Sequence, residues 1–200
     1  MRREYCQETD PAVMEALLRH GTIGRLGTMG RDGYPYITPV NYVFWNGHIY
    51  FHSAPQGEKI ENIRRDNRVC FEVDFPLAYV DLAYRPQDGP CRLHQLYRCV
   101  IVRGRARFVE EAAEKAAALS ALVAAHEKEG SPPPVAPDFA GVTACAVIEI
   151  TPERISAKSD LWQNKSLEER KALASYLLQR NRPGDEETAQ ALSRTERTSP

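Results

Sequence analysis

An Asn-Gly pair at positions 46 and 47 stands between two runs of β-branched and aromatic residues, 34–45 and 48–53. Both residues accept the positive φ angles of a two-residue turn, so the pattern predicts an antiparallel hairpin. Pro35 and Pro39 lie in the first run and favour an edge or bulged strand, because proline cannot donate a hydrogen bond to a neighbouring strand. With a further strand expected at 22–29, this region is predicted to form an antiparallel meander.

Capping residues and apolar periodicity predict the other elements. We expect helices over 11–20, 58–65, 110–127 and 167–178, and further strands over 68–74, 97–109, 144–151 and 154–158. Residues 75–96 show no clear pattern. Strands joined mostly by tight turns, with few helices, predict a mainly β (α+β) fold with peripheral helices, built as a closed or partly closed antiparallel barrel.

The length of 200 residues suits one compact domain. We expect this domain to occupy residues 1–179. From residue 180 the chain is polar and charged, so residues 180–200 are expected to form a disordered tail.

The net charge of −1 gives no electrostatic reason to expect a nucleic-acid partner. No apolar run approaches the ~20 residues that a membrane span needs. The N-terminus leads into no apolar segment of the kind found in secretory signals, so we expect a cytoplasmic protein. The five cysteines are scattered and form no C-x-x-C pair, and Cys91-x-x-His94 is the only pair with ligand-like spacing. The sequence therefore predicts neither a disulfide framework nor a metal site.

The segment from Ser53 to Lys59 joins a predicted strand to a predicted helix. A helix N-terminus offers unpaired N–H groups and a favourable dipole, Ser53 adds a hydroxyl and Lys59 a positive charge. Gly57 allows a bulky phosphate to approach the backbone, whereas Glu58 opposes an anion unless its side chain points to solvent. These residues fit either an anion site or a plain strand–helix junction with a solvated lysine.

Three segments, in the same order and with similar gaps, resemble the flavoproteins related to pyridoxamine 5′-phosphate oxidase. They are 33–43 (GYPYITPVNYV), 49–64 (IYFHSAPQGEKIENIR) and 97–106 (YRCVIVRGRA). The pattern is most similar to the branch that contains nitroimidazole-resistance nitroreductases. The resemblance covers residues 20–160 and implies a split β-barrel, a homodimer and one FMN per subunit bound across the dimer interface.

The resemblance also implies roles for individual residues. Thr38, Pro39, Val40 and Asn41 would lie along the isoalloxazine ring, His52 and Ser53 at the ribityl chain and phosphate, and Lys59 and Asn62 at the phosphate. Tyr97, Arg98 and Trp162 are the candidates for contacts from the partner subunit.

Two departures argue against synthesis of pyridoxal phosphate. Glu58 stands where such oxidases usually carry a second basic residue, and residues 156–162 lack an Arg and His set for a substrate phosphate. We therefore expect a flavin-mediated reduction of a small molecule, with NAD(P)H as a transient reductant.

His52 is the candidate catalytic residue, because imidazole titrates near neutral pH and can relay protons. The alternative for His52 is a half-buried strand histidine. For the whole protein, the alternatives are a non-enzymatic flavin- or haem-binding protein and a deazaflavin-dependent reductase.

Overall fold

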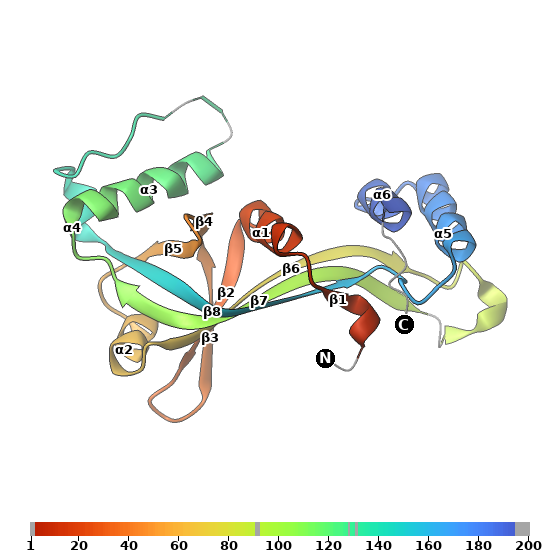
Figure 1. Cartoon of the computed structure of the whole chain (residues 1–200), viewed down its shortest axis with the longest axis horizontal. Coiled ribbons are helices and arrows are strands. Elements are labelled where there is room, and N and C mark those ends of the chain that lie inside the picture. The colour runs from red at the N-terminus through yellow and green to blue at the C-terminus, as the bar shows by residue number, and fades with distance from the viewer. Residues whose placement is uncertain (1–2, 91–92, 128, 131, 195–200) are drawn as a thin grey trace. The chain divides into compact units, whose positions relative to one another are not determined.

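The structure is a computed structural model that describes residues 3–90, 93–127, 129–130 and 132–194. In these ranges eight strands form one sheet (Figure 1). The strands are β1 (Gln7–Glu8), β2 (Ile23–Met29), β3 (Pro35–Asn41), β4 (Val43–Trp45), β5 (His48–Ser53), β6 (Arg68–Val80), β7 (His94–Phe108) and β8 (Ala146–Asp160). The helices are α1 (Pro11–His20), α2 (Glu58–Arg65), α3 (Ala112–His126), α4 (Ala140–Ala144), α5 (Leu167–Arg180) and α6 (Asp185–Arg194), with 3-10 turns at Glu4–Cys6 and Pro86–Asp88.

The chain forms two compact units. Residues 10–73 and 100–156 make up one, called here the sheet unit. The other contains the described parts of residues 1–9, 74–99 and 157–200. It is called here the hairpin unit, because its two C-terminal helices α5 and α6 form a helical hairpin; the β-hairpin of β4 and β5 belongs to the sheet unit. Strands β6, β7 and β8 contribute residues to both units.

The strand order is β3-β2-β6-β7-β8-β5-β4, with β1 paired to β8. The path has two ends, β3 and β4, so the sheet is not closed. β3 is an end strand, as Pro35 and Pro39 led us to expect, and it pairs antiparallel with β2 so that Thr38 lies opposite Leu26. The predicted hairpin is confirmed: Val43 pairs with Tyr50, and Asn46 and Gly47 both have positive φ angles, of 51° and 81°.

The core of the sheet unit lies on one face of its strands. Leu26 on β2 and Phe71 on β6 are cross-strand partners and are both fully buried. Phe51 on β5 and Ile148 on β8 are likewise paired and fully buried. Residues of alternate parity, such as Arg25 and Cys70, are exposed on the outer face. Along β2 this alternation gives one apolar face and one open face, whereas β5 and the first part of β8 carry buried residues on both faces.

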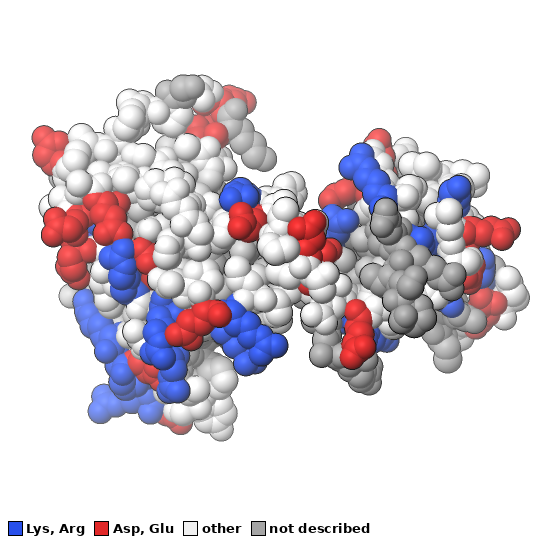
Figure 2. All heavy atoms as spheres, viewed as in Figure 1, with Lys and Arg blue, Asp and Glu red and all other residues white. Residues whose placement is uncertain are grey.

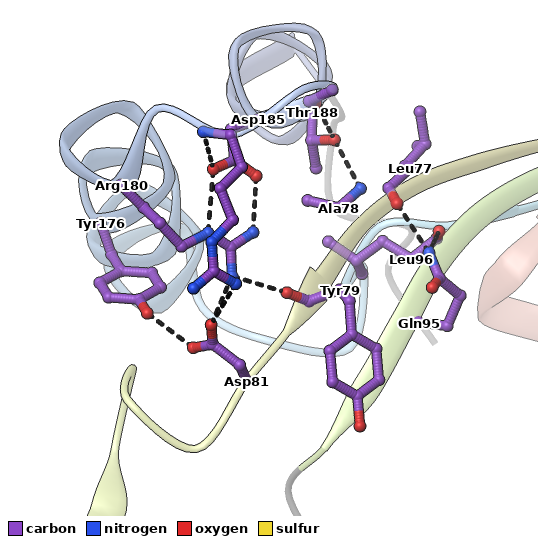
Figure 3. Close-up of polar contacts among 12 residues, drawn as sticks. Leu77, Ala78, Tyr79, Asp81, Gln95, Leu96, Tyr176, Arg180, Asp185 and Thr188 are labelled. Carbon is purple, nitrogen blue, oxygen red and sulfur yellow. Dashed lines mark hydrogen bonds and ion pairs between the residues drawn. The ribbon is translucent and has the colours of Figure 1, made fainter.

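In the hairpin unit, α5 and α6 pack with the distal parts of β6 and β7. Ala78, Val80 and Leu96 from the strands form one apolar cluster with Leu173 and Leu192 from the helices. Polar contacts anchor the same helices (Figure 3). Thr188 Oγ1 accepts a hydrogen bond from the amide of Ala78 at 2.9 Å, and Arg180 Nη1 donates to the carbonyl of Tyr79 at 2.9 Å.

The structure differs from the sequence-based expectation in several places, which include the unexpected strand β1 and helix α4. β6 continues to Val80 through a segment without a clear pattern, because the helices that cover Ala78 and Val80 are remote in sequence. Residues 146–160 form one strand where two were expected. Of residues 180–200, expected to be disordered, 185–194 form helix α6, whose Thr188 and Leu192 are buried, and 195–200 lie outside the described residues.

Candidate functional site

The connection between β5 and α2 carries the predicted anion site. β5 ends at Ser53, and α2 begins after its N-cap residue Gly57, whose φ angle is 119°. Only glycine adopts this angle without strain, and apart from the two chain neighbours no heavy atom of the described residues lies within 4 Å of where a Cβ would stand. The backbone at Gly57 is thus open to the close approach of a ligand.

No side chain in the described part of the chain caps the N-terminus of α2. The amides of Ile60 and Glu61 donate to the Gly57 carbonyl at 3.0 and 3.1 Å. The amides of Glu58 and Lys59 precede the first repeating hydrogen bond of the helix and are its unsatisfied donors. They lie at the positive end of the helix dipole, which favours an anion.

The side chain of Ser53 gives independent evidence that a ligand binds here. The residue is 8% exposed, and its Oγ makes no hydrogen bond within the described part of the chain. A buried hydroxyl without a partner is unfavourable by about 1–3 kcal/mol, so such groups are rare in folded proteins. An acceptor oxygen of a ligand would satisfy it.

Positive charge surrounds this helix. Lys59 is half-buried on its first turn, whereas Glu58 is exposed. Figure 2 shows Lys and Arg side chains gathered at the end of the sheet unit where α2 lies. The donor set of one hydroxyl, backbone amides and an ammonium group therefore fits a phosphate-sized anion.

The side chain of Asn62 makes its hydrogen bonds to protein groups. Its side chain is buried, with Nδ2 donating to Thr28 Oγ1 at 3.1 Å and Oδ1 accepting from Arg65 Nη2 at 3.0 Å. Arg65 also donates to the carbonyl of Met29. Both ends of the Asn62 amide are therefore engaged with β2 and with its own helix.

The residues predicted to flank the flavin ring lie on β3. Val40 is buried, Thr38 is half-buried, and Pro39 and Asn41 are exposed. Since β3 is an end strand, one of its edges has no neighbour among the described strands. Backbone groups along that edge are available to a ligand with a polar rim.

His52 is exposed on β5, where its Cα partner is Val147 on β8. The half-buried alternative considered for this histidine is therefore not what the structure shows. Its imidazole is accessible immediately before Ser53 in the chain.

Tyr97, Arg98 and Trp162 belong to the hairpin unit. Lys158 Nζ donates to the Tyr97 hydroxyl at 2.6 Å, and this hydrogen bond raises the pKa of Lys158. Trp162 has a φ angle of 57°, and its ring centroid lies 6.1 Å from that of Tyr84. Their predicted role as contacts from a partner subunit stays a prediction.

A groove of about 860 Å³ lies on the outer face of the sheet unit. Gly27, Met29, Pro35, Ile37 and Cys70 are among the residues that line it. Ile37 is 66% exposed and Met29 is 45% exposed. Charged residues, among them Arg68, Glu72 and Arg103, also line the groove, so it combines exposed apolar side chains with ionic groups.

Thr28 and Arg65 were missed by the sequence analysis. Thr28 is 4% exposed and shares the inner face of β2 with Leu26, so a polar residue in a core register was the available signal. Arg65 had no comparable signal, because its partner carbonyl belongs to a distant strand.

Among the described residues, no group of three or more His, Cys, Asp or Glu side chains is placed to hold a metal ion. No helix in the described ranges has both the length and the apolar composition needed to cross a membrane.

Comparison with known proteins identifies the fold and the family. The family model described as pyridoxamine 5′-phosphate oxidase matches residues 10–159. The chain therefore belongs to the pyridoxamine 5′-phosphate oxidase family, and its fold is a split β-barrel type with an unclosed sheet. No curated protein sequence matches it.

Three solved structures illustrate the shared fold. The flavocytochrome Anf3 from Azotobacter vinelandii is 21% identical with a TM-score of 0.67, over 80% of this chain and 71% of that chain. The FAD and haem binding protein from Mycobacterium smegmatis is 12% identical with a TM-score of 0.65, over 77% and 73%. A candidate 5-nitroimidazole antibiotic resistance protein from Bacteroides thetaiotaomicron is 24% identical with a TM-score of 0.64, over 76% and 85%.

Proposed function

We propose that this protein binds FMN and uses it to reduce a small molecule. Two observations carry the proposal: the buried Ser53 Oγ has no hydrogen-bond partner in the described part of the chain, and the α2 N-terminus that follows four positions later is not capped by any described side chain. Together with Lys59 these donors suit one phosphate group, which FMN carries at the end of its ribityl chain. Family membership and the flavin-binding names of two structural relatives support the same cofactor class.

The residues of the sheet unit have distinct tasks in this proposal. Ser53 and Lys59 hold the phosphate, and the free edge of β3 from Thr38 to Asn41 offers backbone groups to the polar rim of the flavin ring. Bound FMN supplies the electron-transfer chemistry of the reaction. NAD(P)H is proposed as the transient reductant.

His52 is proposed as the proton donor to the reduced small molecule. Its imidazole is exposed on β5 one position before Ser53, and an accessible imidazole can transfer a proton to a bound molecule. A His52→Gln variant should keep FMN affinity and lose turnover. Turnover equal to that of the wild type would remove His52 from the mechanism.

The partner that we propose is a second copy of this chain. The outer face of the sheet unit exposes Ile23, Met29, Tyr34 and Ile37. A homodimer through this face would remove these exposed apolar side chains from water.

Mass spectrometry of the cofactor released from the purified protein tests the proposal first. FMN is the expected cofactor. Detection of FAD, haem or a deazaflavin instead would show that FMN is not the cofactor. Steady oxidation of NAD(P)H in the presence of a nitroaromatic or a quinone would then support a reductase. A chain that is colourless and does not bind added FMN contradicts the proposal, and flavin binding without turnover on a broad panel favours a non-enzymatic flavin-binding protein.

A further inference from the structure

Helix α2 has only eight residues, and a helix of this length depends on tertiary contacts for its stability. Ile60 and Ile63 are buried and supply its apolar contacts. Apolar burial is non-directional, so it leaves small sliding and rotation of the helix weakly opposed. Directional polar contacts must therefore determine where its N-terminal amides lie.

Those directional contacts run from α2 to β2. Asn62 is 2% exposed and donates from Nδ2 to Thr28 Oγ1 at 3.1 Å. Arg65 Nη2 donates to Asn62 Oδ1 at 3.0 Å and also to the carbonyl of Met29. These hydrogen bonds connect α2 to the last two residues of β2, through the side chain of Thr28 and the backbone carbonyl of Met29.

We propose that Asn62, Thr28 and Arg65 position the N-terminus of α2 under the flavin phosphate, and that Asn62 is not itself a phosphate ligand. The inference rests on the proposed function. The Asn62 amide is occupied at both ends by protein groups. It also lies four residues beyond Glu58, which is about 6 Å along a helix axis.

Positioning matters here because charge-assisted hydrogen bonds are short. Their donor–acceptor distances fall within roughly 2.7–2.9 Å, and a site held more loosely than about 0.5 Å loses affinity. A shift of α2 would move the amides of Glu58 and Lys59 together, since the helix moves as a unit. The loss would fall on the phosphate and leave the flavin ring's contacts in place.

The test compares FMN with riboflavin, which lacks the phosphate, in calorimetric titrations of the full-length apoprotein. The readout is the ratio of the two dissociation constants. Thr28→Val removes the acceptor of Asn62 at nearly constant volume, and Thr28→Ser restores a hydroxyl. Arg65→Ala removes the Met29 contact at an exposed position, and Arg64→Ala makes the same charge change on the same helix.

We expect Thr28→Val and Arg65→Ala each to lower the preference for FMN over riboflavin by about five- to tenfold. Thr28→Ser should recover it, and Arg64→Ala should leave it within about twofold. Arg65→Ala decides the matter if Thr28→Val does not fold.

Three results would overturn the positioning role. They are an unchanged preference in folded Thr28→Val and Arg65→Ala, an equal loss of affinity for both flavins, and an Arg64→Ala effect as large as that of Arg65→Ala. A wild-type protein that binds both flavins equally would instead refute the phosphate site itself.

Discussion

Arg180 and Asp185 join the end of α5 to the start of α6 through two hydrogen bonds. Arg180 Nε donates to Oδ2 at 2.9 Å and Nη2 donates to Oδ1 at 2.6 Å (Figure 3). Both side chains are buried, and Arg180 also contacts Asp81 at 2.9 Å. The two ionic contacts fix the turn between the helices and tie it to the end of β6.

Replacing Asp185 by alanine should therefore destabilise the protein. The change leaves a buried guanidinium with one fewer counter-charge, which should lower the free energy of unfolding by about 3 kcal/mol. Urea denaturation followed by circular dichroism measures it. Glu186→Gln, an exposed acid one residue along, is the control and should change stability little. Equal effects of the two changes would contradict the structural role of Asp185.

The same network predicts a loss of stability in acid. The Tyr176 hydroxyl and Arg180 hold the pKa of Asp81 below its ordinary value, and Arg180 does the same for Asp185. The unfolded chain then binds more protons than the folded chain, so stability rises with pH through this range. The stabilisation from these two carboxylates should be fully present above about pH 4, the ordinary pKa of Asp, and should decline as the pH falls further.

Urea unfolding at a series of pH values measures this dependence. Asp81→Asn should show a shallower acid decline than the wild type, because one of the shifted carboxyls is gone. A variant with the full wild-type slope would show that other carboxyls cause the acid response.

Tyr50 supports a buried carboxylate in the sheet unit. Its hydroxyl donates to Glu149 Oε2 at 2.8 Å, and burial together with Glu149 raises the pKa of Tyr50. Tyr50→Phe should lower the free energy of unfolding by about 1–2 kcal/mol, because Glu149 loses a donor that water does not replace. Tyr34→Phe, at an exposed position, is the thermal-unfolding control. Matching melting temperatures in the two variants would show that the hydrogen bond contributes nothing.

Ile37→Asp tests the proposed homodimer. The residue is 66% exposed, so the change should leave the fold intact and place a charge in the apolar outer face. Analytical ultracentrifugation should show a dimer for the wild type and a monomer for the variant. Val123→Asp alters an exposed apolar residue on α3 and should remain dimeric. A monomeric wild type would dismiss the second copy as the partner.

Local chemistry made the sheet unit predictable. Asn46-Gly47 specified its turn from two residues, and Pro35 and Pro39 marked an edge strand that the structure confirms. The helix over 58–65 was also predictable, because Ile60 and Ile63 stand at helical spacing and form one apolar face.

The hairpin unit depends on contacts that no local pattern reveals. Ala78 and Val80 are covered by helices about a hundred positions later, and α6 packs against α5 in the same apolar cluster. A polar, charged composition at 180–194 therefore suggested disorder, although Thr188 and Leu192 are buried.

The candidate site was predictable only in the part that depends on residues close together in the sequence. Ser53, Gly57 and Lys59 are close in sequence, so their juxtaposition followed from one strand–helix connection. The contact between Asn62 and Thr28 joins residues 34 positions apart, and nothing local distinguishes an amide that binds a ligand from one that binds a strand.

Lys59→Ala addresses the phosphate site directly. One charge-assisted contact contributes about 1.5–3 kcal/mol, so FMN affinity should fall by at least about tenfold while riboflavin affinity stays unchanged. Lys171→Ala, on the exposed surface of α5, is the control and should bind FMN normally. Wild-type FMN affinity in Lys59→Ala would place the phosphate elsewhere.

Titration of the wild-type apoprotein with FMN and with riboflavin tests the central claim most directly, because the two ligands differ only in the phosphate that Ser53, Lys59 and the α2 amides are proposed to hold. Binding of FMN more than about tenfold tighter than riboflavin is the predicted result. Equal affinities, or no binding of either flavin, would contradict the account.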